Sequence, residues 1–105
     1  MVYETPYAKY SDVVIEINNY RDNNSLALSI FSPTEGPITR LTVNIDFDGA
    51  TETRAFVDTN NSPEAIDFIE KYKIGEFTGI KGFSGYCTYP LYEFDLGKIK
   101  ELNGN

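Results

Sequence analysis

The sequence predicts an α+β fold: an antiparallel β-sheet with one main α-helix packed on one face, in a single domain. Three observations support this prediction. Several segments alternate apolar and polar residues with the period of two that is typical of half-buried strands, and turn-forming residues separate them. One segment instead has the apolar spacing of an amphipathic helix. The chain of 105 residues is also long enough to bury one hydrophobic core.

The first two predicted strands form a hairpin. Their apolar residues recur at every second position, and residues 21–24, which read RDNN, supply the turn between them. One face of each strand is therefore expected to pack on the core. The inward-facing positions are Val13, Ile15, Ile17, Leu26, Leu28 and Ile30.

The segment RLTVNIDFD at residues 40–48 predicts the clearest strand of the chain. Its expected inward positions are Leu41, Val43, Ile45 and Phe47, and its expected outward positions are Thr42, Asn44, Asp46 and Asp48. A turn at residues 48–49 should follow, and a shorter strand over residues 53–57 is expected to pair beside the first.

The main helix is predicted between residues 62 and 75. Ser62 is expected to be the N-cap, Pro63 suits the first helical position, and Gly75 is placed to end the helix. The apolar stripe that should face the sheet consists of Ala65, Phe68, Ile69 and Tyr72.

The last third of the chain has a weaker pattern. Gly79, Gly82 and Gly85 indicate an irregular loop, and residues 91–96 alternate like a final strand. Residues 97–105 are expected to form a frayed helix or a disordered tail of the one domain, which spans residues 1–105.

The charge of the chain is strongly acidic. Sixteen acidic residues against nine basic ones give a net charge of -7, which argues against direct nucleic-acid binding and favours a basic partner. Residues 41–70 contain seven acidic residues and only Arg54 as a base, so their local charge is -6. The expected partner-binding residues are these seven: Asp46, Asp48, Glu52, Asp58, Glu64, Asp67 and Glu70.

Two interpretations of this charge remain open. On a strand, Asn44, Asp46 and Asp48 would form an outward row of acceptors and negative charge that mimics a phosphate backbone. An ordinary solvated surface is the alternative, because surface charge also keeps small proteins soluble. Asp58 has a local alternative as well, since its side chain suits a turn before the helix.

The chain offers few groups for catalysis. It has no histidine, which removes the usual general base and the commonest metal ligand, so a noncatalytic protein without cofactor or metal is expected. Cys87, the only cysteine, lies among aromatic residues and is expected to pack rather than react. The segment NIDFDGATE matches the first half of a calcium loop, but Ala55 stands where the bidentate glutamate should be.

The sequence shows no targeting signal for another compartment. The first residues lack a secretory signal, and no apolar run is long enough to cross a bilayer. A cytoplasmic location is therefore expected.

The segments AFVDTNN (residues 55–61) and SGYCTYPLYEF (residues 84–94) resemble a small family of unknown function carried by conjugative elements and phages of gut bacteria. The strand LTVNI before them and the helix between them fit the same family, so the resemblance covers residues 41–94. It implies an origin in a mobile element and provides no catalytic residues.

Small acidic proteins of such elements include anti-CRISPR and anti-restriction proteins. The resemblance and the charge together therefore imply a host defence nuclease as the partner, foremost Cas9 or its guide-RNA complex. An acidic surface on this chain would block DNA binding or cleavage there. A regulatory or structural partner in the conjugative-transfer machinery is the alternative.

Overall fold

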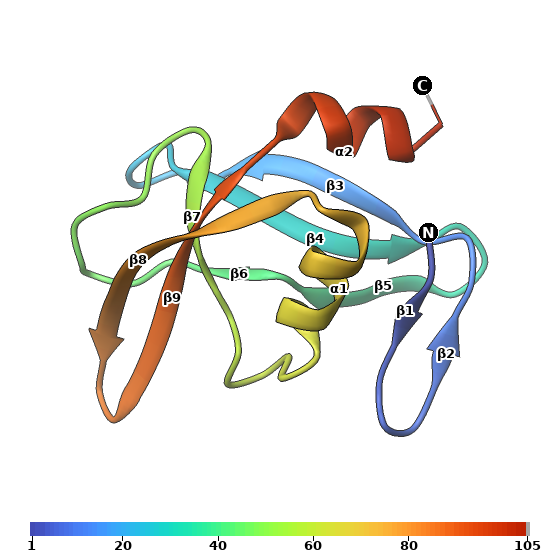
Figure 1. Ribbon diagram of the computed structural model, residues 1–105, viewed down its shortest axis with the longest axis horizontal. Helices are drawn as coiled ribbons and strands as arrows, with labels where there is room; N and C mark the ends of the chain where they lie inside the picture. Colours follow the sequence, from blue (N-terminus) through green and yellow to red (C-terminus); the bar gives the residue numbers. More distant parts are fainter. Residues whose placement is uncertain (105) are drawn as a thin grey trace.

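The computed structural model describes residues 1–104 and shows an α+β fold with antiparallel strand pairing throughout the sheets (Figure 1). The strands are β1 (Tyr3–Glu4), β2 (Lys9–Tyr10), β3 (Val14–Asn19), β4 (Leu26–Ser32), β5 (Gly36–Arg40), β6 (Thr42–Val43), β7 (Arg54–Val57), β8 (Gly75–Ser84) and β9 (Cys87–Phe94), and the helices are α1 (Ala65–Tyr72) and α2 (Leu96–Leu102). The strands form three sheets, in the orders β1-β2, β3-β4-β5 and β6-β7-β9-β8. The α+β class is confirmed, whereas a single sheet covered by one main helix is too simple a description.

The hairpin of β3 and β4 is confirmed. Ile15 pairs opposite Ile30 and Ile17 opposite Leu28, so the apolar positions of the two strands lie on one face. Five of the six predicted positions are buried in the main core, and Ile17 packs against it while partly exposed. Period-two alternation was sufficient here because one face of each strand is more deeply buried than the other.

The long strand predicted over residues 40–48 is wrong. The chain bends at Leu41 between β5 and β6, and it leaves the sheet after Val43. Thr42, expected outward, is buried, and its hydroxyl oxygen accepts a hydrogen bond of 3.0 Å from the Leu28 N–H. Phe47, expected inward, is 39% exposed. The N–H of Phe47 bonds to the Ile45 carbonyl at 2.9 Å, a tight turn that an extended strand does not allow.

The main helix is confirmed, but both of its predicted ends need correction. Glu64 occupies the N-cap position of α1, because the Ser62 hydroxyl is bonded to Thr39 Oγ1 at 2.6 Å and donates to the Arg40 carbonyl at 3.1 Å. At the other end Lys73 adopts the left-handed conformation with φ 53°, and Gly75 already begins β8. The stripe predicted for this helix faces inward, with Ala65, Phe68 and Ile69 buried.

The glycine-rich segment is a strand instead of the predicted loop. β8 and β9 form a long hairpin with extra residues in β8 between Phe77 and Lys81, where Gly79 has φ +89°. Gly85, with φ +60°, lies in the turn at the tip. The glycines therefore form a bulge and a turn within a hairpin, as isolated glycines in strands often do.

Most of the predicted carboxyl-terminal tail is a docked helix. Asp95 caps α2 by accepting a hydrogen bond of 3.0 Å from the Lys98 N–H, and Ile99 is fully buried. The Asn103 side chain bonds to both backbone polar groups of Ile15. Of the two alternatives for this tail, the structure shows a helix up to Leu102 and not a disordered segment, and residue 105 lies outside the described residues.

The buried apolar residues form two clusters. The main one joins the β1-β2 hairpin, the β3-β4-β5 sheet, β7, β9 and both helices. A smaller cluster of Phe56, Tyr89 and Leu91 is covered by residues of β6 and of the segment that follows it. Within residues 1–104, no helix is long and apolar enough to span a membrane.

Candidate interaction surface

The segment between β6 and β7 holds the most exposed part of the predicted acidic surface. Asp46, Asp48 and Glu52 are all exposed in residues 44–53, which contain no lysine or arginine. We call this segment the acidic loop. It carries a charge of -3, and it takes the place of the strand on which a regular row of carboxylates was expected.

The acidic loop is tied to neighbouring segments. The Asn44 side-chain amide donates to both carboxylate oxygens of Asp22, at 2.9 and 3.1 Å, and Asn23 Nδ2 donates to Asn44 Oδ1 at 3.0 Å. At the other end the Thr51 carbonyl accepts a hydrogen bond of 2.8 Å from the Leu26 N–H of β4. These contacts fix the backbone of the acidic loop near both of its ends, and they place Asp22 beside it.

Asp58 is not available for a partner. Its side chain is only 5% exposed, and its oxygens accept hydrogen bonds from the Asn61 N–H at 3.2 Å and from Asn61 Nδ2 at 3.1 Å. The local alternative considered for this residue, a turn before the helix, matches this geometry. Asp58 is therefore excluded from the candidate surface.

The acidic residues of α1 lie on a second surface. Asp67 and Glu70 are exposed, and Glu64 is half-buried at the start of the helix. Glu64 and Asp67 line a cleft between α1 and β1 that also contains Lys71. In Figure 1 the acidic loop lies at the far left, whereas this end of α1 faces the β1-β2 hairpin. The structure therefore divides the predicted acidic surface into two parts.

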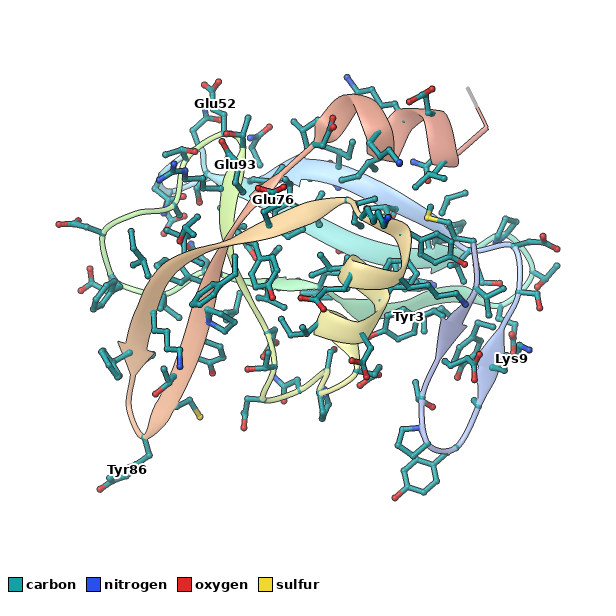
Figure 2. All side chains as sticks on the ribbon, in the orientation of Figure 1. Tyr3, Lys9, Glu52, Glu76, Tyr86 and Glu93 are labelled. Carbon is teal, nitrogen blue, oxygen red and sulfur yellow. The ribbon has the colours of Figure 1, made fainter. Side chains whose placement is uncertain are left out.

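Two acidic residues that the sequence reasoning missed lie directly opposite each other. Glu76 of β8 pairs with Glu93 of β9, and Arg54 of β7 pairs with Glu93 from the other side. Arg54 Nε lies 3.7 Å from Glu93 Oε2, and Thr53 Oγ1 donates to the same oxygen at 2.9 Å. Figure 2 shows Glu52, Glu76 and Glu93 on the same side of the molecule. Only the strand register could have identified this pair.

Exposed aromatic rings adjoin the acidic loop. Phe47, between Asp46 and Asp48, meets Phe83 of β8 edge to face with ring centroids 6.0 Å apart. Phe47 and Phe83 are 39% and 59% exposed. Tyr86 is fully exposed at the tip of the β8-β9 hairpin (Figure 2). Aromatic residues are enriched at the centre of protein interfaces, and polar residues form the rim around them.

Cys87 has a packing role. It is partly buried and packs against the small cluster of Phe56, Tyr89 and Leu91. Its side chain is the main cause of a raised pKa of the neighbouring Tyr89 hydroxyl. Within residues 1–104 there is no group of three or more histidine, cysteine, aspartate or glutamate side chains that would hold a metal ion.

A separate cleft of about 490 Å³ lies between the β1-β2 hairpin, β5 and the start of α1. It is lined in part by Tyr3, whose side chain is fully buried and whose hydroxyl has no hydrogen-bond partner among the described residues. Burial, and secondarily the nearby Glu64 carboxylate, raises the pKa of Tyr3, so the phenol stays protonated at neutral pH.

These features define a small α+β domain with an acidic and aromatic candidate interaction surface. The family model described as "Domain of unknown function (DUF4313)" matches residues 14–105, and the chain therefore belongs to this family. The match includes the acidic loop and the β8-β9 hairpin, and the β1-β2 hairpin precedes it. Neither the curated proteins nor the solved structures give a match to the chain.

Proposed function

We propose that this chain is a noncatalytic protein of a mobile element that inhibits a host defence nuclease, with Cas9 as the foremost target. The observation that carries the proposal is the acidic loop. It presents three exposed carboxylates without a basic residue among them, on a segment that side-chain and backbone hydrogen bonds tie to its neighbours.

The physical basis is competition for a basic surface. A Cas9-type nuclease holds nucleic acid in a positively charged channel and reads the short motif beside its target with arginines. Carboxylates placed on either surface would replace phosphate and exclude DNA. Charge of this kind accelerates association and makes it depend on salt, whereas apolar contacts at the centre set the dissociation rate.

The first experiment compares two variants of equal net charge. One carries Asp46→Lys, Asp48→Lys and Glu52→Lys in the acidic loop. The matched control carries Glu16→Lys, Glu35→Lys and Glu101→Lys, three exposed positions outside the predicted acidic surface. Cas9 cleavage of target DNA is measured against increasing amounts of each protein, and cooperative thermal unfolding confirms that each variant is folded.

The loop variant should lose inhibition by about tenfold or more, the scale on which charge changes alter association rates within one interface, and the control should stay near wild type. Equal loss in both variants would show that only net charge matters. Full inhibition by a folded loop variant would refute the surface.

The order of addition tests the step that is blocked. If the acidic loop occupies the DNA site, inhibition should require addition before DNA and should weaken at higher salt. No inhibition of any Cas9 tested, together with recovery of conjugation proteins in a pull-down from donor cells, would instead support the transfer-machinery alternative.

A further inference from the structure

Exposed aromatic rings and carboxylates lie next to each other beside the smaller apolar cluster. Phe47 lies between Asp46 and Asp48 in the acidic loop, and its ring meets the Phe83 ring edge to face at 6.0 Å. Both rings keep a large exposed fraction, 39% for Phe47 and 59% for Phe83. A partner group would therefore meet an aromatic surface and negative charge together.

The smaller apolar cluster holds these rings in place. Phe47 packs edge to face on the buried ring of Phe56, with centroids 6.0 Å apart. Gly82, the neighbour of Phe83, lies so close to the cluster that a Cβ there would be 2.6 Å from Phe56 Cε1 and 2.8 Å from Ile45 Cδ1. The hairpin thus sits directly on the cluster, and the rings are positioned before any partner arrives, which lowers the entropy cost of binding.

We infer that Phe47 and Phe83, with Asp46 and Asp48, form a site for an arginine side chain of a basic protein partner. This inference rests on the proposed function and names the chemistry of its contact. A guanidinium is planar and weakly hydrated, so it stacks on an aromatic ring while it donates paired hydrogen bonds to a carboxylate. A lysine ammonium is a compact, strongly hydrated charge and gains less from the same site.

The local charge agrees with this occupant. Lys81 is the only basic residue in the β8-β9 hairpin, residues 75–94, and the acidic loop has none. Lys81 is exposed two residues before Phe83 on the same strand and adds +1, so the acidic loop and Lys81 together carry a charge of -2. This remaining negative charge favours a cation and disfavours a phosphate or a carboxylate.

The test uses two short peptides, acetyl-Gly-Arg-Gly-Arg-Gly-amide and its lysine counterpart, titrated into the whole ¹⁵N-labelled chain at low salt. The arginine peptide should bind about two- to fivefold more tightly, the scale of an exposed cation–π contact, with amide shifts centred on residues 44–48 and 81–84. Equal binding of both peptides, or shifts centred on α1, would overturn the inference.

Variants then separate the rings from the charges. Phe83→Leu keeps an apolar side chain but removes one of the two aromatic faces, so it should reduce the preference for arginine over lysine. Tyr86→Ala removes another exposed aromatic side chain of the same hairpin and should leave the preference intact. A preference that Phe83→Leu leaves unchanged, or one that Tyr86→Ala reduces, would contradict the assignment.

The nuclease assay distinguishes this site from the function on which it rests. If the inhibitor proposal and the arginine site are both correct, Phe83→Ala should weaken inhibition because the complex dissociates faster. The salt dependence of inhibition should stay that of wild type. If the acidic-loop variant loses inhibition while Phe83→Ala does not, the arginine site fails and the inhibitor proposal stands. If wild type inhibits no nuclease, the inhibitor proposal fails, and the peptide titration still decides whether the arginine site exists.

Discussion

Replacing Asn103 by alanine tests whether the carboxyl-terminal helix is part of the folded domain. Asn103 Nδ2 donates to the Ile15 carbonyl at 2.9 Å, and Asn103 Oδ1 accepts from the Ile15 N–H at 2.9 Å. β3 is an edge strand of its sheet, so the amide side chain occupies backbone groups that point away from β4. It substitutes there for a neighbouring strand.

The expected cost follows from these two hydrogen bonds. Each contributes about 1 kcal/mol net, so Asn103→Ala should lower the free energy of unfolding by about 2 kcal/mol. Urea denaturation at 25 °C, followed by far-UV circular dichroism, measures this change. The amide proton of Ile15 should also exchange faster with solvent.

Lys100→Ala provides the control, because Lys100 is exposed on the same helix and its replacement should change stability by less than about 0.5 kcal/mol. An Asn103→Ala variant with the same free energy of unfolding as the Lys100→Ala control would refute the reasoning. The side-chain bonds to β3 would then contribute nothing to the folded state.

Two further changes probe the cores. Gly82→Ala should lower the free energy of unfolding in urea by about 1–3 kcal/mol, because its Cβ would overlap Phe56 and Ile45. An unchanged free energy of unfolding would mean that the β8-β9 hairpin can move away from these side chains without cost. Tyr3→Phe should be neutral or slightly stabilising in the same assay, because the buried hydroxyl has no partner, and a loss above about 1 kcal/mol would reveal one. Burial raises the pKa of Tyr3 and of Tyr92 in the folded chain, so the unfolded state releases these protons first and stability should fall as pH rises above about 10. Tyr3→Phe should make that alkaline fall shallower, and an unchanged slope would contradict the assignment to Tyr3.

The structure shows which sequence patterns were reliable. The β3-β4 hairpin and the stripe of α1 could be predicted, because each segment has one buried and one exposed face that imposes its own period. The same alternation failed over residues 44–48, where the chain turns away from the sheet. The glycines of β8 also misled, because their turn chemistry lies inside a hairpin that pairs with β9.

The acidic surface shows the same limit. Local composition identified the acidic loop, whose exposure follows from its charge, but it also included Asp58, whose carboxylate is buried in a turn. It missed Glu76 and Glu93, which are 17 positions apart in the sequence and lie opposite each other across two strands. Strand register, a product of pairing along the whole hairpin, brought them together.

The sequence alone was thus enough to predict the α+β class, the β3-β4 hairpin, the main helix and the acidic character of the chain. Amphipathic period, turn residues and net charge predict these features because each feature depends on residues that are neighbours along the chain. Contacts between distant residues decided the rest. Asn103 docks α2 on Ile15, and Phe47 meets Phe83 beside the acidic loop. Such contacts form only when the whole chain packs, since their energy comes from burial and pairing of groups that no local pattern relates.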